Sequence, residues 1–366
     1  MRKDVSLGKD EALLISGCAI LMMIIHHFFG FKEFLVNGNS YVSLFSIGGI
    51  EFECILAAFG KLCVAIFAFC SGYAIWVVSS QYTSWPRIFK RIGKFLQAYW
   101  IICILFIVFG LCLGLRTPSI KDFGLNLIGL GTGPFSPYVN VVFSWYVAFY
   151  CCLLLLAPLL LKLFLLRNNH SKKVGKSFLI DLFCLLAISA VVHVLCNSGF
   201  DFINPLPAAI CGLLTAKWNL FGHFNELRPA YRSMWVSVLV IFLLIPIRQG
   251  LIWYHISFWG IEEGIFSLLF IYTVLNIFNC LNGGMLRSVF MLLGRYSMDL
   301  WFLHGIFFMT AVGGNIQHFL YWPRYSIFIL LWGLVLLLPI AKGVIVIQNQ
   351  AWSITSKALG LKENEK

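Results

Sequence analysis

The chain alternates long apolar runs with short polar segments, and this pattern indicates membrane-spanning helices. The first run, 12–31, contains no Asp, Glu, Lys or Arg. An α-helix needs about 20 apolar residues to cross the hydrocarbon core of a bilayer. No polar segment between the runs is long enough for a soluble domain. Ten runs are predicted to span the membrane: 12–31, 54–80, 94–115, 139–166, 177–196, 202–216, 231–247, 255–281, 288–310 and 324–347.

Prolines make two of these runs irregular. The run 202–216 is short and opens with Pro205 and Pro207, and the run 139–166 contains Pro158. Proline interrupts helical hydrogen bonding, so a count of nine or eleven spans also fits the pattern. The first run is too long for a signal-peptide core and no small-residue cleavage site follows it, which predicts a retained span.

Composition agrees with this pattern. Of 366 residues, 60% are hydrophobic and 11% are charged, and the mean hydropathy is +0.88, which excludes a soluble globule with a polar surface. We therefore predict an all-α, polytopic transmembrane helical bundle with one domain over 1–350 and a short polar tail over 351–366. The twelve cysteines form no CxxC pair and lie almost entirely in apolar runs, where they are expected to pack rather than to bind metal or form disulfides.

The distribution of Lys and Arg predicts the orientation of the chain. With the N-terminus in the cytoplasm, 21 of the 27 basic residues fall in cytoplasmic segments and 5 in external ones, while Lys61 lies inside a span. Short cytoplasmic loops retain positive charge, so both termini are expected to be cytoplasmic. The net charge of +12 then reflects topology and contact with anionic lipid, and no nucleic-acid partner is predicted.

Several ionisable residues fall inside the predicted spans. At 1.5 Å per residue, His27 lies about 22 Å from the cytoplasmic start of the first span, in its outer third. Lys61, Glu262 with its neighbour Glu263, and His304 are expected at a similar depth. Such groups usually line a site or a cavity, and a carboxylate and a lysine near a histidine can hold a neutral imidazole ready as a base.

Other interpretations of these residues remain open. A membrane histidine often only bridges helices, and Glu262 and Glu263 could mark a helix start near the interface. Depth and composition do not choose between an enzyme, a transporter and a proton relay. The basic stretch 85–100 contains Arg91 and Lys94 and is either a positive-inside anchor or a cradle for a phosphorylated ligand. Trp253 is either an interfacial belt residue or a platform for a sugar ring.

Four stretches resemble the acyltransferase-3 family of integral membrane O-acyltransferases. "SGCAILMMIIHHFF" resembles the first-helix motif, in which a basic residue precedes the histidine, His27, by eleven positions. This chain has Ser16 at that basic position. On one helix, Ser16 and His27 share a face about 16 Å apart, while His26 points roughly 100° away. The other stretches are "GKLCVAIFAFCSGYAIW" with Ser71 and Tyr73, "KRIGKFLQAYW" with Arg91 and Lys94, and "LGRYSMDLWFLHGIFF" with His304.

The resemblance implies transfer of an acyl group, most often acetyl from acetyl-CoA, to a sugar hydroxyl of a cell-surface or lipid-linked glycan. It implies a multi-pass protein of the plasma membrane that needs no metal. Taken together with the depth of the ionisable residues, the resemblance leads us to expect His27 as the general base. Lys61, Glu262 and His304 are expected to complete the catalytic set, and Arg91, Lys94 and Ser16 to face the donor. Ser71, Tyr73 and Trp253 would face the acceptor.

Two rival functions use the same residues differently. A proton-coupled transporter or flippase for a glycan precursor would use His27, Lys61, Glu262 and His304 as a proton path. A structural or assembly subunit is the second rival, and the serine at position 16 favours it.

Overall fold

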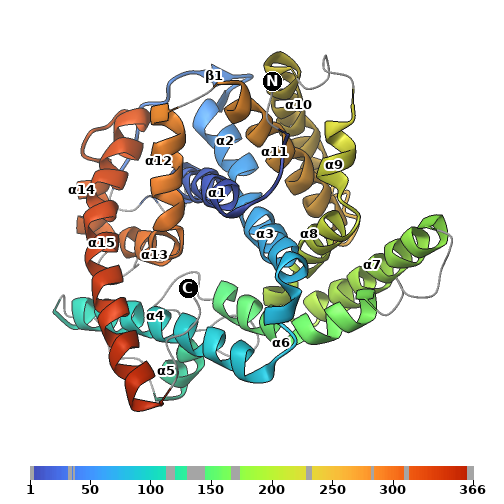
Figure 1. The fold of residues 1–366 in the computed structure, drawn as a ribbon. Helices are drawn as coiled ribbons and strands as arrows, with labels where there is room; N and C mark the ends of the chain where they lie inside the picture. The colour runs from blue at the N-terminus through green and yellow to red at the C-terminus, as the bar shows by residue number, and fades with distance from the viewer. Residues whose placement is uncertain are drawn as a thin grey trace. The chain divides into compact units, whose positions relative to one another are not determined.

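The computed structural model describes residues 4–31, 35, 38–112, 120–129, 145–165, 174–227, 233–281, 284–308 and 313–360. Nearly all regular structure in these residues is helical (Figure 1). Two short antiparallel strands, β1 (Ser46–Ile47) and β2 (Ile50–Glu51), form the sheet. The chain divides into two compact units, which are described separately. Unit 1 comprises Met1–Gly30, Phe45–Trp85 and Phe149–Ser297, and unit 2 comprises Phe31–Leu44, Pro86–Ala148 and Met298–Lys366.

Unit 1 is built around the first helix, α1 (Lys9–Phe29), which contacts α2, α3, α11 and α12 (Figure 1). Its apolar side chains, among them Leu14, Ile20 and Met23, are fully buried by these neighbours. The other helices of unit 1 are α2 (Phe52–Gly60), α3 (Cys63–Val77), α6 (Trp145–Leu165, which starts in unit 2), α7 (Val174–Asn197), α8 (Leu206–Lys217), α9 (Leu220–Asn225), α10 (Met234–Trp253), α11 (Ile261–Cys280) and α12 (Gly284–Arg295), with 3-10 turns at Ser79–Gln81 and Asp201–Ile203.

Glycines allow two helix pairs of unit 1 to approach closely. A Cβ added to Gly72 of α3 would meet the carbonyl oxygen of Ala209, and one added to Gly212 of α8 would meet that of Phe69. The crossing of α1 with α12 uses Gly17 and Gly294 in the same reciprocal way. Small residues bring helix backbones together in membranes, so these four positions define two tight crossings.

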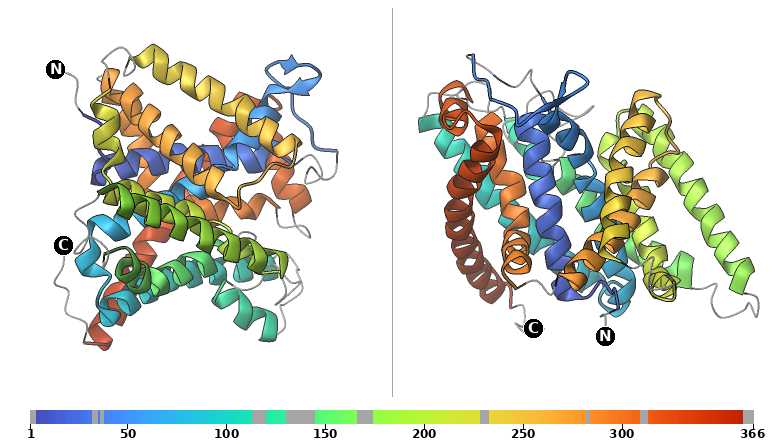
Figure 2. Two further views of the ribbon diagram at one scale, coloured as in Figure 1. Left: turned by 90° about the vertical axis from the view of Figure 1, so that its right-hand side faces the viewer. Right: turned by 90° about the horizontal axis from the view of Figure 1, so that it is seen from above.

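α7 packs against α8 and lies at the edge of unit 1 (Figure 2). Its other side carries exposed apolar side chains, including Leu179 (64% exposed) and Phe183 (69%). In a helix long and apolar enough to cross a bilayer, such side chains face lipid.

Unit 2 contains α4 (Trp85–Cys112), α5 (Ile120–Leu127), α13 (Ser297–Leu303, whose first residue belongs to unit 1), a 3-10 turn at His304–Phe308, α14 (Gly313–Tyr321) and α15 (Ser326–Ala358). The buried Gln348 amide of α15 donates to Asp299 Oδ1 at 2.8 Å and to the Ala98 carbonyl oxygen at 3.2 Å. Gln97 of α4 donates to Thr355 of α15 at 3.2 Å. These polar contacts connect α4, α13 and α15 within the unit.

The predicted all-α, polytopic class is confirmed. Eight helices among the described residues are long and apolar enough to span a membrane: Lys9–Phe29, Phe52–Val77, Trp85–Phe109, Trp145–Leu165, Lys176–Asn197, Met234–Trp253, Ile261–Cys280 and Ser326–Ala358. The protein is thus a multi-pass membrane protein.

Two of the ten expected spans differ from the prediction. The run 202–216 forms the 12-residue α8, because a 3-10 turn precedes it and Pro205 and Pro207 fix its start. The run 288–310 is divided between α12, α13 and a 3-10 turn, since Arg295, Ser297 and Asp299 interrupt its apolar pattern. Eight and ten crossings would both leave the termini on one side of the membrane, whereas nine or eleven would not, so the shared side of the termini stays a prediction.

Several further boundaries differ, and two helices end later than expected: α10 at Trp253 rather than residue 247, and α15 at Ala358 rather than residue 347. The expected span 54–80 is broken between α2 and α3 at Lys61 and Leu62. The span expected at 94–115 begins earlier, because the basic stretch from Trp85 is already helical in α4. The first described residues of the expected span 139–166 are those of α6, and 139–144 lie outside the described residues.

Candidate active site

The last turn of α1 presents two adjacent half-buried histidines, His26 and His27. Their ring centroids are 4.9 Å apart and their ring planes meet at 63°. α1 is regular from Lys9 to Phe29, so Ser16 and His27 keep the predicted separation along one helix. The helix ends at Gly30, whose backbone N–H donates to the His26 carbonyl oxygen at 2.9 Å.

The end of α2 fixes the ring of His26. His26 Nδ1 lies 2.7 Å from the carbonyl oxygen of Ala57. A carbonyl oxygen only accepts hydrogen bonds, so neutral His26 carries its proton on Nδ1 and its lone pair on Nε2. α2 stops at Gly60, and the carbonyls in the last turn of a helix have no full set of helical donors. Gly60 also packs on α1, because a Cβ there would meet the Met22 carbonyl oxygen and lie 3.3 Å from the His26 Cβ.

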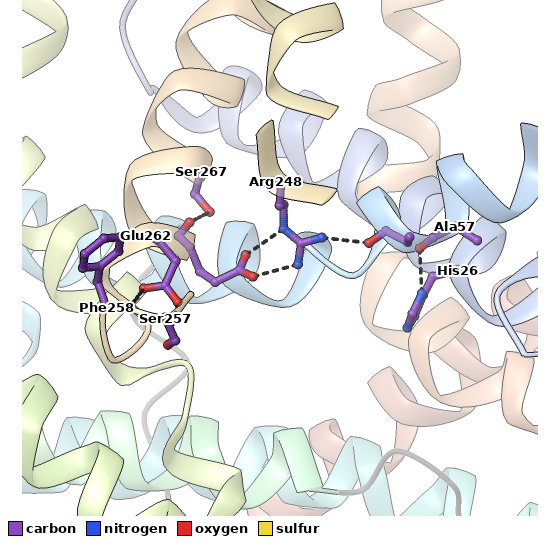
Figure 3. Close-up of polar contacts among 9 residues, drawn as sticks. His26, Ala57, Arg248, Ser257, Phe258, Glu262 and Ser267 are labelled. Atoms are coloured by element: carbon purple, nitrogen blue, oxygen red, sulfur yellow. Dashed lines mark hydrogen bonds and ion pairs between the residues drawn. The ribbon is translucent and has the colours of Figure 1, made fainter. Parts of the chain in front are cut away.

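An ion pair with a buried arginine approaches the same end of α2 from α10 and α11 (Figure 3). Arg248 Nη2 donates to Glu263 Oε1 at 2.7 Å, and Arg248 Nε donates to Oε2 at 3.3 Å. Arg248 Nη1 donates to the Ala58 carbonyl oxygen at 2.7 Å. Arg248 is 3% exposed, so this two-pronged contact neutralises a charge that water scarcely reaches. Consecutive carbonyls of α2 therefore hold His26 and Arg248.

Lys61 lies directly after Gly60, in the break between α2 and α3, and its side chain is exposed. A Cβ on Gly60 would lie 3.3 Å from the His26 Cβ, so Lys61 follows directly after the residue that packs on His26. The structure thus brings the histidine pair, Lys61 and the Arg248–Glu263 pair together in unit 1.

Glu262 occupies a different position from its neighbour Glu263. Gly260, with φ +83°, precedes the first turn of α11. The Glu262 carboxylate accepts hydrogen bonds from Ser257 Oγ at 2.9 Å and from the Phe258 backbone N–H at 3.0 Å (Figure 3). A carboxylate in the first turn of a helix is favoured by the helix dipole, so Glu262 stabilises the start of α11.

The three residues expected near the acceptor lie apart from these contacts. Ser71 donates its hydroxyl to the Phe67 carbonyl oxygen at 2.8 Å, one turn back in α3. The Tyr73 ring lies 5.8 Å from that of Phe221 in α9. Trp253 is 62% exposed at the end of α10.

Three expected site residues belong to unit 2. Arg91 and Lys94 lie on α4, Arg91 half-buried and Lys94 exposed. His304 is fully buried at the start of a 3-10 turn, and its Nδ1 lies 3.3 Å from the Leu300 carbonyl oxygen. Among the described residues, no three His, Cys, Asp or Glu side chains gather as metal ligands would. Metal-free chemistry stays a prediction.

Comparison with known proteins adds the deciding observation. A family model described as an acyltransferase domain, that of acyltransferase-3, matches residues 14–346. The chain belongs to the acyltransferase-3 family. No curated protein and no solved structure gives a significant match. Membership of the acyltransferase-3 family makes this a membrane acyltransferase, which implies an acyl donor and an acceptor.

Sequence reasoning missed Arg248 in this acyltransferase-3 protein. Arg248 was expected in an external loop, because the apolar run 231–247 ends just before it. The structure continues α10 to Trp253. The signal was present in the apolar residues Leu251, Ile252 and Trp253 that follow the arginine.

Proposed function

We propose that this protein transfers an acyl group, most often acetyl, from acyl-CoA to a hydroxyl of a sugar in a cell-surface or lipid-linked glycan. The observation that carries the proposal is the acyltransferase-3 match over residues 14–346, which includes His27, Lys61 and the Arg248–Glu263 pair. The proposed location is the plasma membrane.

His27 is the general base of the proposed reaction. It takes the proton of the acceptor hydroxyl, and the oxygen then attacks the carbonyl carbon of the thioester. The negative charge that develops on the carbonyl oxygen is favoured by a nearby cation, and Lys61 at the α2–α3 break supplies one. Collapse of the intermediate releases CoA as a thiolate, which takes the proton back from His27. No metal is required in this sequence of steps.

His26 positions His27 in this mechanism. The Ala57 carbonyl fixes the His26 ring, and that ring meets the His27 ring edge-on at 4.9 Å. The Arg248–Glu263 pair holds the adjacent Ala58 carbonyl and so fixes the end of α2. Glu262 supports this arrangement through the start of α11.

Arg91 and Lys94 are proposed to bind the phosphates of the donor, because α4 starts with four basic residues over 87–94. Ser16 contributes only a neutral hydroxyl where the family motif has a cation, so more of the phosphate binding depends on α4. His304, Ser71, Tyr73 and Trp253 remain proposed members of the site on the family motifs and on their residue types alone.

The test is the O-acyl content of surface glycan, measured by NMR before and after mild base. Cells lacking the protein are complemented with wild type, His27→Ala or His223→Ala. His223 is the control, because its side chain is 65% exposed on α9, where it contacts Glu226. We expect His27→Ala to lower the transfer rate by about 100-fold or more, since general-base catalysis contributes about 10²–10⁴-fold.

Equal membrane levels of the variants are required and are checked by immunoblot. Ester that is lost in the deletion strain and restored by wild type and His223→Ala, but not by His27→Ala, supports the proposal. Ester that stays unchanged in every strain contradicts acyl transfer and favours the transporter. The transporter would depend on the proton gradient and not on acyl-CoA.

A further inference from the structure

A second buried ion pair lies in unit 1, between α7 and α8. Lys217 Nζ lies 2.5 Å from Asp181 Oδ2, and both side chains are 1% exposed. Lys217 also donates to the Phe164 carbonyl oxygen at 2.8 Å, and the indole N–H of Trp218 donates to Asp181 Oδ2 at 2.9 Å. The lysine charge is thereby neutralised and fully bonded in the apolar interior.

The Asp181 carboxylate is satisfied on one oxygen only. Both donors, Lys217 and Trp218, bind Oδ2. Oδ1 is buried and has no hydrogen-bond partner among the described residues. Buried carboxylate oxygens are normally hydrogen-bonded, and an unmet acceptor of this kind is costly. Oδ1 is therefore a buried acceptor left without a donor by the described residues around it.

Asp181 lines a cavity of about 120 Å³ between α7, α8 and α11. An engineered apolar cavity of about 150 Å³ takes up benzene rather than water, so this cavity suits a small apolar body. The walls are mostly aliphatic and aromatic: Phe178, Leu182, Leu185, Leu214, Ile265 and Leu268.

The charges beside the cavity select a neutral donor. Asp181 and Lys217 cancel each other, so an ammonium ligand would add an unpaired buried charge. A carboxylate ligand would be repelled by Asp181. A hydroxyl donates one hydrogen bond without adding charge, and an aliphatic chain matches the walls.

The entrance of the cavity faces the bilayer. Three lining residues also have large exposed fractions, namely Phe178 (40%), Leu182 (40%) and Ile265 (51%). They belong to α7 and α11, both long and apolar enough to span a membrane. A ligand can therefore enter from lipid, with the rest of its chain remaining among the acyl chains.

From these observations we infer that the cavity binds the hydroxyl end of a neutral aliphatic alcohol taken from the bilayer, whose O–H donates to Asp181 Oδ1. This site is independent of the proposed acyl transfer. It shares α11 with the candidate active site, since Gly264 in its wall directly follows Glu263.

The test uses the purified full-length protein in lipid nanodiscs and a long-chain primary alcohol that carries a photoactivatable diazirine close to its hydroxyl. After irradiation, labelled peptides are identified by mass spectrometry. We expect labelling at residues 178–185, 211–215 and 264–268, which line the cavity on α7, α8 and α11. Octan-1-ol should displace the probe at about a tenfold lower mole fraction in lipid than octane, because a hydrogen bond to a charged acceptor is worth about one factor of ten or more. Octylamine and octanoate should compete no better than octane.

Two matched substitutions separate the cavity from the lipid-facing surface. Leu268→Phe fills the cavity and should abolish labelling at these residues. Leu179→Phe makes the same change on the exposed side of α7, outside the cavity, and should leave labelling intact. Equal displacement by octane and octan-1-ol, or unchanged labelling in Leu268→Phe, overturns the inference, as does the absence of label at all three lining segments.

Discussion

Arg248 and Glu263 form an ion pair whose partners are unequally buried. The Arg248 side chain is 4% exposed and that of Glu263 is 31% exposed. Removing the carboxylate leaves a cation without a partner in the interior, whereas removing the arginine leaves a carboxylate that water can reach. The two truncations are therefore not equivalent.

We predict that Glu263→Ala lowers the free energy of unfolding by about 3 kcal/mol or more, and that Arg248→Ala lowers it by less. Arg287→Ala is the matched control, because the Arg287–Glu11 pair is partly exposed (25% and 15%) and should contribute about 1 kcal/mol or less. Thermal unfolding in detergent, followed by intrinsic fluorescence, ranks the three variants. A larger loss in Arg248→Ala than in Glu263→Ala would contradict the stated asymmetry.

Single ionisable residues inside the spans were easier to recognise from the sequence than the residues with which they interact. His27 and Lys61 were expected from intramembrane polarity, and both lie beside the same end of α2. The Asp181–Lys217 pair was missed because Lys217 directly follows the expected span 202–216 and was therefore assigned to a loop. One sequence shows that a residue is ionisable, but it does not show the partner, which here lies 36 positions away in the chain.

At the level of elements, the α3–α8 crossing depends on the absence of side chains. A Cβ on Gly72 would meet the backbone carbonyl of Ala209, which cannot rotate aside, so one helix must move. A Cβ on Gly343 of α15 would meet nothing within 4 Å. The same substitution should therefore have opposite effects at these two helical positions.

Gly72→Ala is expected to destabilise the protein by about 1–3 kcal/mol through overpacking. Gly343→Ala is expected to stabilise it by about 0.5–1 kcal/mol through helix propensity. Melting temperatures in detergent measure both changes. An unchanged melting temperature for Gly72→Ala would show that α3 and α8 do not make the close contact described above.

The apolar pattern predicted most helices. It failed for α8, which is apolar but is short and surrounded by protein. α1 and α7 correspond closely to expected runs, whereas α10 ends six residues later and α11 begins six residues later than expected. α8 reads as a span from its apolarity, yet it has only 12 residues, about 18 Å of helix. Hydropathy reports how apolar a segment is and does not tell whether lipid or protein surrounds it. The apolar pattern therefore could not predict that protein, rather than lipid, surrounds most of the residues from Leu206 to Thr215.

For the whole molecule, the side on which the α10–α11 loop lies depends on whether α8 crosses the membrane. A short helix and irregular backbone are tolerated at membrane depth when protein covers them. α8 is buried against α3, α7 and α11, so it can complete a crossing that is too short for lipid. The loop after Trp253 then lies on the side opposite the N-terminus.

Tyr254 lies in this loop and its side chain is 78% exposed. We predict that the variant Tyr254→Cys reacts with a membrane-impermeant thiol reagent added to intact cells. Modified peptides are identified by mass spectrometry, because each of the twelve native cysteines is a free thiol. Lysed cells give the full extent of labelling. Labelling of Tyr254→Cys only after lysis would place the loop in the cytoplasm and remove α8 from the set of crossings.

The α3–α8 crossing also constrains the order in which the chain can be assembled during synthesis. α3 leaves the ribosome about 130 residues before α8, at positions 63–77 against 206–217. Until α8 is synthesised, Gly72 lacks the Ala209 backbone against which it packs in the folded protein. α8 is too short to be held by lipid alone, so its insertion needs α3 already in place. A chain that ends before residue 206 would therefore leave this face of α3 without its partner helix.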